Sequence, residues 1–246
     1  MLQKLFNQFL PDSGIIQRLT LPVIVLAILA AYLAGWMKVK KNIRTPYTRK
    51  TFHFIIFSAA GIIQYFYGLH AVSLMGTIVS VIVLTVVIAG ERLWLYKALA
   101  RETDAPHQKK FIMLPLIATA LGGILSNIFF PVTAYIGYFV GGWGDAVGEP
   151  VGTKWGKHRY TVPTLFGVKA TRSIEGSFAV MLVSIFISFI CLINISSFSI
   201  SHVLLASLVC GIVAASVEAI SSHGLDNLTI QLCASGVLSL FLHFFN

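Results

Sequence analysis

The sequence is built from long apolar runs separated by short polar segments. Eight of these runs are long enough, or nearly long enough, to cross a lipid bilayer as helices. They cover residues 20–37, 52–68, 71–91, 111–130, 131–146, 175–195, 202–220 and 227–245. The second and fifth runs are short, and Pro131 separates the fourth run from the fifth. The pattern predicts an all-α fold, a polytopic membrane bundle of eight helices, or of seven if one short run is re-entrant.

Charged residues lie in alternate connections between the predicted helices. Three connections rich in Lys and Arg cover residues 38–50, 92–110 and 154–172. The connections that alternate with them contain no Lys, Arg, Asp or Glu and lie near residues 68–70, 130–131 and 194–201. Basic residues are retained on the cytoplasmic side of a membrane. We therefore expect the charged connections to face the cytoplasm and both chain ends to lie on the opposite side.

The composition favours a membrane protein and argues against a nucleic-acid-binding one. Hydrophobic residues make up 57% of the 246 residues and charged residues only 11%, which is unlike a soluble domain. The basic connections beside apolar runs account for the net charge of +9, as topology signals and contacts to anionic lipid. Residues 1–19 mix charged and apolar positions and predict an interfacial segment, followed by a single transmembrane domain at 20–246.

Five acidic residues are predicted to reach the same cytoplasmic face from different helices. They are Asp145, Glu149, Glu175, Glu218 and Asp226. Charged groups at membrane depth are costly, so they indicate function. Mg²⁺ binds a few carboxylates and takes its other ligands from water and substrate phosphates, which suits this group. Simpler roles stay open for two of them, Glu175 as an acid in a first helical turn and Asp226 as an N-cap. The acids interpreted as merely solvated are Asp12, Glu102 and Asp104.

Basic residues follow the first two acids and are suited to phosphate oxygens. They are Lys154, Lys157, Arg159, Lys169 and Arg172. The stretch KATRSIEGS, residues 169–177, is predicted to begin the sixth helix, whose free N–H groups favour an anion. Upstream, Arg49, Lys50 and His53 can share one helical face, and the first two are interpreted as topology anchors.

Glycines recur at every fourth residue, at Gly144, Gly148, Gly152 and Gly156. This spacing is typical of helices that pack closely, and for the glycines alone we favour packing over a ligand cradle. The stretch is not a Walker A motif, because its spacing differs and no Ser or Thr follows the lysine. The glycines therefore need the neighbouring charged residues before they indicate a phosphate site.

Three motifs in this order resemble the polyprenol kinase family of integral membrane proteins. They are GDAVGEPVGTKWG (144–156), KATRSIEGS (169–177) and VEAISSHGLDNLT (217–229), and the upstream RKTFHF resembles the family's short Arg-Lys…His element. The family includes dolichol, phytol and farnesol kinases and a CTP-dependent diacylglycerol kinase. The resemblance implies a multi-span helical enzyme that phosphorylates a lipid hydroxyl, typically with CTP. Gly148, where dolichol kinases tend to have alanine, and a longer gap between Gly156 and Lys169 depart from the dolichol kinases, and the short chain is more similar to the phytol and diacylglycerol kinases.

The resemblance also implies positions for the site. The family's nucleotide-binding pattern falls on Asp145, Gly148, Gly152, Gly156, Lys169, Thr171, Arg172, Glu175 and Gly176. Lys154 and Asn227 complete the expected phosphate-binding set. We expect CTP·Mg²⁺ to bind at the cytoplasmic mouth, with Asp145 and Glu149 as metal ligands. The lipid alcohol approaches from the bilayer and leaves its tail in an apolar groove. The residues expected to accept its proton are Asp226 or Glu218, with His53 as a weaker candidate.

Two other functions compete with a lipid kinase. A cytidylyltransferase that makes a CDP-lipid also uses CTP and Mg²⁺. The C-terminal Lys-Asp…Gly-Gly…Asp-Arg signature of phosphatidate cytidylyltransferases is missing, however, and no Lys or Arg follows Arg172. A transporter places its charges at the membrane midplane between two repeats. Here the acids gather at one face and the sequence contains no visible repeat, so this alternative ranks third.

Overall fold

A computed structural model of the chain describes residues 7–195 and 198–245. The apolar runs form long helices, because a helix satisfies the backbone N–H and C=O groups that lipid cannot. In the described part of the chain the long helices are α2 (Ser13–Val39), α3 (Thr45–Ala89), α5 (Gln108–Phe129), α6 (Ala134–Trp155), α7 (Ile174–Ile193), α8 (Ile200–Ile220) and α9 (Asp226–Phe245). All of them except α6 are long and apolar enough to cross a membrane. The prediction of an all-α polytopic bundle is confirmed.

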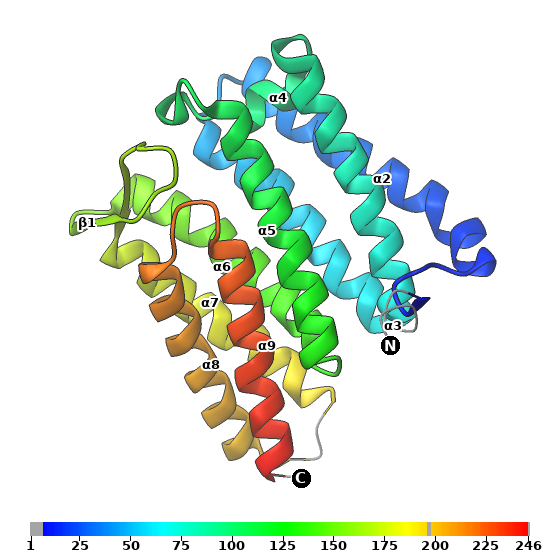
Figure 1. Cartoon of the computed structure of the whole chain (residues 1–246). Helices are drawn as coiled ribbons and strands as arrows, with labels where there is room; N and C mark the ends of the chain where they lie inside the picture. The colour runs from blue at the N-terminus through cyan, green and yellow to red at the C-terminus, as the bar shows by residue number, and fades with distance from the viewer. Residues whose placement is uncertain (1–6, 196–197, 246) are drawn as a thin grey trace.

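Helix α3 contains two of the predicted helices joined at a reversal. Gly68 interrupts it with φ 78° and ψ −169°, a backbone conformation that is open to glycine and costly for other residues. The chain turns back there, and Figure 1 shows the first arm descending and the second arm rising beside it. The two arms correspond to the predicted runs 52–68 and 71–91. With both arms counted, eight long helical segments run along the bundle within residues 7–195 and 198–245.

Helix α6 differs most from its predicted span of 131–146. It continues through Pro150 to Trp155, so the second half of the glycine motif is helical. The helix ends nine residues later than expected because its polar C-terminal turns pack against α7 and leave the apolar part of the bundle. The fifth predicted run thus forms one continuous helix of 22 residues.

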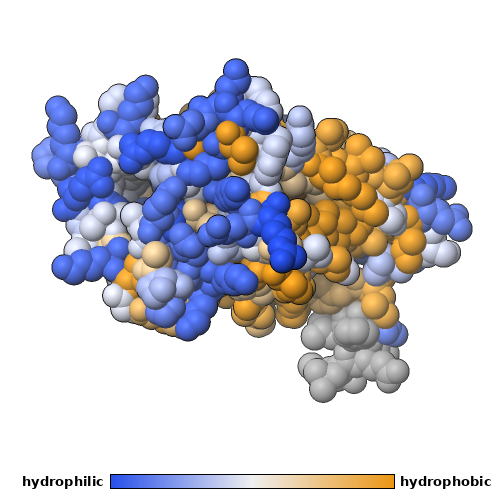
Figure 2. Space-filling view, turned by 90° about the horizontal axis from the view of Figure 1, so that it is seen from above, coloured by the Kyte–Doolittle hydropathy of each residue, from blue (hydrophilic) through white to orange (hydrophobic). Residues whose placement is uncertain are grey.

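The charged connections gather at one end of the bundle, at the top of Figure 1. They contain the short helices η1 (Gly90–Arg92), α4 (Trp94–Leu99) and η2 (Glu102–Asp104). A two-stranded antiparallel sheet, β1 (Arg159–Val162) and β2 (Ala170–Ser173), was not expected from the sequence. It forms where Tyr, Thr and Val favour extended backbone. Seen from above, hydrophilic residues cover the left part of the view in Figure 2, and hydrophobic residues are visible to the right of its centre.

The beginning of α2 and the end of α9 lie at the opposite, lower end (Figure 1). Helix α2 starts at Ser13, earlier than the predicted 20, because Asp12 caps it by accepting a hydrogen bond from the N–H of Ile15 at 2.9 Å. Asp12 is therefore an N-cap rather than simply a solvated acid. Residues 1–6 of the predicted interfacial segment lie outside the described residues.

The apolar interior is divided into two clusters. One is built mainly from α2, α3 and α4 and contains Ala27, Val79 and Leu95. The other is built from α6, α7, α8 and α9 and contains Val140 and Ile230. Helices α3 and α6 pack against each other between the clusters. Charged side chains gather at the polar end of this boundary.

Candidate active site

A polar cavity of about 590 Å³ opens at the charged end of the bundle. It is lined by the start of α3, the segment around η2, the C-terminal half of α6, β2 and the ends of α7, α8 and α9 nearest to this face. Four of the five converging acids line it, namely Asp145, Glu149, Glu218 and Asp226. Residues that are more than 70 positions apart along the chain are thus brought to one cavity, as the charge pattern predicted.

The first cluster of charges joins α3 to α6. Asp145 and Glu149 are four residues apart, so they lie on one face of α6. Lys50 Nζ lies 2.5 Å from Asp145 Oδ2 and 3.1 Å from Glu149 Oε2. His53 Nε2 lies 3.4 Å from the same Asp145 oxygen. The Lys50 side chain is only 6% exposed, so its interpretation as a topology anchor is wrong. It neutralises two carboxylates inside the bundle.

The second cluster joins β2 to α7, α8 and α9. Arg172 Nε lies 2.8 Å from Glu218 Oε1, and its Nη2 donates to Asp226 Oδ2 at 2.9 Å. The same guanidinium donates to the backbone carbonyl oxygens of Glu218 and Ser221. Ser177 donates to the other Glu218 oxygen at 2.9 Å. Arg172 therefore holds two carboxylates from different helices in fixed positions. Because no Lys or Arg follows it in the sequence, Arg172 is also the residue that supplies Glu218 with a basic partner.

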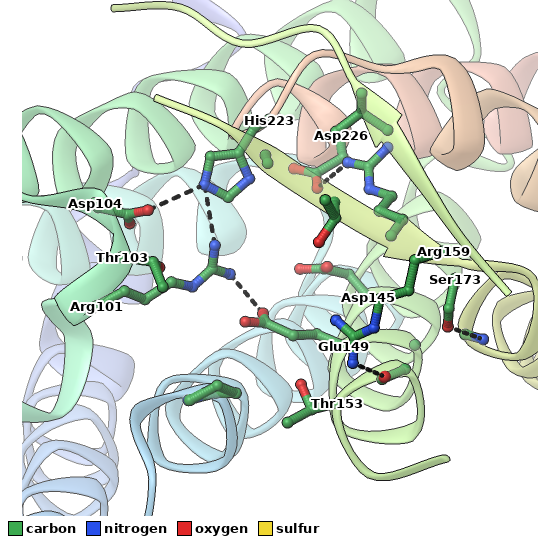
Figure 3. Close-up of a pocket in the computed structure, with 18 of the residues that line it drawn as sticks. Arg101, Thr103, Asp104, Asp145, Glu149, Thr153, Arg159, Ser173, His223 and Asp226 are labelled. Carbon is green, nitrogen blue, oxygen red and sulfur yellow. Dashed lines mark hydrogen bonds and ion pairs between the residues drawn. The ribbon is translucent and has the colours of Figure 1, made fainter. Parts of the chain in front are cut away.

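The third cluster closes one wall of the cavity, and Figure 3 shows its geometry. Arg101 Nη2 donates to Glu149 Oε2 at 2.5 Å, and its Nη1 lies 3.0 Å from His223 Nε2. His223 in turn lies 3.5 Å from Asp104 Oδ1. Burial lowers the pKa of Arg101, but the carboxylates of Glu149 and Asp104 outweigh that effect and raise it. Asp104 is 2% exposed, so its interpretation as a solvated acid is wrong.

Sequence reasoning did not single out Arg101 or His223. Arg101 stands in a basic connection, where a topology role is the default interpretation. His223 lies inside the motif VEAISSHGLDNLT, and its position three residues before Asp226 was the signal that could have identified it. Both side chains act through contacts with residues that are distant in the sequence.

The glycines pack α6 closely against α7 and also line the cavity. A Cβ atom added to Gly148 would lie 2.5 Å from Val180 Cγ2, and one added to Gly176 would lie 2.8 Å from the Gly148 carbonyl oxygen. One added to Gly152 would meet Ser173 Oγ at 2.9 Å. Gly148, Gly152 and Gly176 nevertheless line the cavity. Close packing and a place in the candidate site are therefore properties of the same residues.

Some predicted phosphate-binding residues do not line the cavity. Lys154 is five residues beyond Glu149 on a continuous helix, which turns it about 140° away. Its ammonium group instead lies 4.5 Å from the centre of the Trp155 ring. Glu175, in the first turn of α7, pairs with His158 at 2.8 Å. Gly156 ends α6 beside Ser173. The helical continuation past Pro150 removes Lys154 and Gly156 from the expected pocket, and Glu175 is engaged by His158 instead.

The N-terminus of α7 is capped by a side chain of the protein, which satisfies one of the N–H groups predicted to bind an anion. Ser173 is its N-cap and accepts a hydrogen bond from the N–H of Gly176 at 3.1 Å. The residues before it form β2, and α7 begins at Ile174, one residue from the predicted start of the sixth run at 175. In the alternating strand, Arg172 is directed to Glu218 and Asp226, while Thr171 is exposed at the cavity.

Three cations at the cavity have no carboxylate partner among the described residues. Arg44 precedes α3, and Lys169 precedes β2, and both line the cavity. A third, Arg159, donates only to the Gly152 carbonyl oxygen at 3.4 Å. The buried arginines and lysine are already paired, whereas these three exposed cations are not. They are suited to the oxygens of a polyphosphate.

The predicted metal ligands Asp145 and Glu149 each keep one carboxylate oxygen that is not used in an ion pair. Among the described residues, no group of three or more His, Cys, Asp or Glu side chains is arranged to hold a metal. Asp145 and Glu149 each use one oxygen in ion pairs, and Oδ1 and Oε1 accept no hydrogen bond from the described residues. Two carboxylate oxygens fit Mg²⁺, which completes its shell with waters and substrate phosphates.

Asn227 and His53 lie just beneath the cavity rather than in its lining. Asn227 follows Asp226 at the start of α9, and its amide donates to Thr119 on α5 at 3.0 Å. His53 reaches Asp145 from α3 and stacks on Phe57 with ring centres 4.1 Å apart. Both residues therefore stand between the charged cavity and the apolar interior.

Comparison with known proteins identifies one informative relative. The chain is 35% identical over 116 residues to a phytol kinase of Synechocystis sp. (strain ATCC 27184 / PCC 6803 / Kazusa), a match that covers 47% of each chain. The match therefore spans about half the length of that relative. No family model and no solved structure matches the chain. The similarity to a phytol kinase confirms the resemblance to the polyprenol and phytol kinase-like proteins that the motifs predicted.

Proposed function

We propose that the protein is a membrane kinase that transfers a phosphoryl group to the hydroxyl of a lipid alcohol. The observation that carries the proposal is the polar cavity, where paired carboxylates face cations that have no acidic partner. A nucleoside triphosphate needs carboxylates to bind its metal ion and unpaired cations to bind its phosphate oxygens. The similarity to a phytol kinase over 116 residues supports the same reaction class.

The residues divide the work between the nucleotide and the alcohol. Asp145 and Glu149 would hold Mg²⁺ through their remaining oxygens, and the metal would neutralise charge on the phosphates. Lys169, with Arg44 and Arg159, would bind phosphate oxygens at the open side of the cavity. These groups position the donor rather than react with it, which is what phosphoryl transfer requires.

The transfer itself moves one proton and one phosphoryl group. The hydroxyl oxygen of the lipid attacks the γ-phosphorus, the bond from that phosphorus to the leaving diphosphate breaks, and the hydroxyl proton passes to a base. We propose Asp226 as the base, with Glu218 as the alternative, since both line the cavity. Arg172 holds both carboxylates in place. The leaving nucleoside diphosphate departs from the polar side.

The donor and the orientation belong to the same proposal. CTP is the donor implied by the resemblance to polyprenol kinases, and phytol is the first acceptor to test because of the matched relative. The cavity would face the cytoplasm, since the basic connections gather at its end of the bundle. Nucleotide would then enter from the cytoplasm and alcohol from the bilayer.

The decisive experiment incubates the purified protein with Mg²⁺, phytol, farnesol, a longer polyprenol or diacylglycerol, and CTP labelled at either the γ- or the α-phosphate. A kinase transfers label to these alcohols only from the γ-position, whereas a cytidylyltransferase transfers label only from the α-position, to a lipid phosphate supplied as acceptor in a parallel reaction. Substitution of CTP by UTP or ATP identifies the donor. Absence of transfer from any labelled nucleotide to any of these alcohols would refute the proposal.

Asp145→Asn tests the metal assignment within that assay. The substitution removes a charge but keeps the shape, and Lys50 retains its contact with Glu149 at 3.1 Å, so we expect a folded protein without turnover. Glu91→Gln is the matched control, because Glu91 is exposed outside the cavity. Full activity of Asp145→Asn would disprove the role of Asp145 in binding the metal.

A further inference from the structure

A second cavity, of about 830 Å³, lies below the polar one. We call it the apolar groove. Its walls are the two arms of α3, helix α5 and Tyr138 of α6, and Phe9 and Leu10 lie at its lining. Most of its lining side chains are hydrocarbon, including Ile56, Met75 and Leu116. It therefore provides an environment for hydrocarbon rather than for a nucleotide.

The dimensions of the apolar groove suit one hydrocarbon chain. Its lining on α5 runs from Leu116 to Ile128, a rise of about 18 Å along the helix. One leaflet of a bilayer contributes about 15 Å of hydrocarbon thickness, which is close to that length. A volume of about 830 Å³ lies within the usual range for a site that holds one small molecule.

The apolar groove meets the polar cavity at two contacts. On one side Phe57, which lines the groove, stacks on His53, and His53 Nε2 lies 3.4 Å from Asp145 Oδ2 in the cavity. On the other side Thr119, which lines the groove, accepts a hydrogen bond from Asn227, the neighbour of Asp226. The two cavities are thus separated by one layer of side chains.

Two buried polar atoms in this layer form no hydrogen bond with the described residues. They are Asn227 Oδ1 and His53 Nε2, and the latter lies 3.4 Å from Asp145 Oδ2 without a hydrogen bond between them. Buried polar atoms in proteins normally have a partner, so each of these indicates a missing polar group. A hydroxyl group can donate one hydrogen bond and accept another, so one hydroxyl can serve such a pair of atoms. The layer is where the polar end of an otherwise apolar ligand would be stabilised.

We propose that the apolar groove binds the single hydrocarbon chain of an isoprenoid-type alcohol, with its hydroxyl group held in the layer of His53 and Asn227. This inference rests on the proposed function and names the acceptor of that reaction as a one-chain alcohol rather than a diacylglycerol. The hydroxyl then points towards Asp145 and Asp226, where the phosphoryl donor is held. The chain extends away from the charged end of the bundle, as a lipid in that leaflet does.

Gly76 offers a way to fill the apolar groove without disturbing the fold. It lines the groove from the second arm of α3, and a Cβ atom added there meets nothing within 4 Å. Gly76→Phe is expected to displace about two buried methylene groups of a C20 alcohol and to raise its KM about tenfold. A C10 alcohol such as geraniol, which leaves part of the groove empty, is expected to lose less than threefold.

Ile88→Phe is the matched control, since Ile88 lies on the same arm of α3, is 81% exposed and is not part of the groove. It should leave both KM values within twofold of wild type. Equal effects of Gly76→Phe on the C20 and C10 alcohols would overturn the proposal, and so would a diacylglycerol turned over faster than phytol. A rise confined to the C20 alcohol would support it.

A phytol analogue with a photoreactive diazirine on its chain separates this inference from the proposed function. Cross-links to peptides of α5 and the second arm of α3 are expected even without nucleotide, and in Gly76→Phe they should require a higher concentration of the analogue. If those cross-links form while no alcohol is phosphorylated, the groove assignment stands and the kinase proposal fails. If phytol is phosphorylated but cross-links elsewhere, the kinase proposal stands and the groove assignment fails.

Discussion

Removal of the Lys50 ammonium group is the most informative perturbation of the candidate site. Lys50 is 6% exposed and contacts both Asp145, at 2.5 Å, and Glu149, at 3.1 Å. In Lys50→Met, Glu149 keeps its partner Arg101 at 2.5 Å, whereas Asp145 keeps only the contact with His53 at 3.4 Å. The substitution therefore leaves essentially one buried carboxylate without its principal partner.

The structure sets the size of the effect. Removing one member of a buried ion pair typically costs about 3–5 kcal/mol, because the other charge stays buried. The remaining His53 contact places this variant at the lower end, about 3 kcal/mol. For a chain of 246 residues, 1 kcal/mol corresponds to about 2–4 °C in melting temperature. We expect Lys50→Met to melt about 6–12 °C below wild type in the absence of divalent cations.

Mg²⁺ should reverse part of this loss. The variant frees Asp145 Oδ2, so a metal ion meets one more available oxygen than in wild type. At 100 times its Kd, a ligand that binds only the folded state adds about 2.7 kcal/mol of stability. The melting temperature of Lys50→Met should therefore rise more with Mg²⁺ than that of wild type. This difference is specific to a metal site and does not follow from lost packing.

The assay is thermal unfolding of the detergent-purified protein, followed by circular dichroism, with and without MgCl₂. Lys97→Met is the matched control, because Lys97 is exposed and makes no ion pair among the described residues. It should melt within about 1–2 °C of wild type. A Lys50→Met protein as stable as this control would refute the importance of the buried pair, and equal Mg²⁺ effects would refute the metal site.

Three further predictions follow from the same geometry. Lys169→Ala should raise the KM for CTP about tenfold in steady-state kinetics without changing the melting temperature, because Lys169 is exposed and unpaired among the described residues. Gly148→Val should cost about 1–3 kcal/mol and lower the melting temperature, since even a Cβ there lies 2.5 Å from Val180 Cγ2. Gly68→Ala should cost about 1–3 kcal/mol in thermal unfolding, because it forces a φ of 78° on a residue with a Cβ.

Each of these variants has a matched comparison. Lys157→Ala removes an exposed lysine outside the cavity and should leave the KM for CTP unchanged. Gly76→Ala places a Cβ where no atom lies within 4 Å and should not lower the melting temperature. If Lys157→Ala raises the KM for CTP as much as Lys169→Ala does, the assignment of Lys169 to phosphate binding is wrong. If Gly148→Val has the same melting temperature as Gly76→Ala, the packing argument is wrong. If Gly68→Ala has the same melting temperature as Gly76→Ala, the argument about the turn is wrong.

The helices could be predicted from the sequence because lipid imposes one strong rule on every apolar run. The predicted 202–220 and 227–245 agree with α8 and α9 to within two residues at each end. The end of α6 could not be predicted in the same way, because Pro150 and the polar residues beyond it resemble a loop. Only the packing of Gly148 and Gly152 against α7 shows why the helix continues.

The acids of the site were easier to predict than its buried cations. An acid such as Glu218 near the end of an apolar helix is easy to recognise as functional, because placing a charged group at membrane depth costs free energy and packing gives no reason for it. Lys50 and Arg101 belong to connections rich in Lys and Arg, and such residues are usually explained by their role in setting the orientation of the protein in the membrane. Complementary spacing was the available signal for Lys50, since it shares a helical face with His53 just as Asp145 and Glu149 share theirs.

The division of the apolar interior into two clusters has a consequence for how the protein is made. Synthesis proceeds from the N-terminus, so α2 to α4, with Lys50 and Arg101, are produced before α6. The carboxylate partners of both cations, Asp145 and Glu149, lie in α6. Until that helix is inserted, the first half of the bundle presents an uncompensated cationic surface at its boundary. The arrival of α6 therefore completes both the site and the assembly, and a nascent chain stopped before residue 134 should associate with anionic lipids or chaperones rather than persist as a stable half.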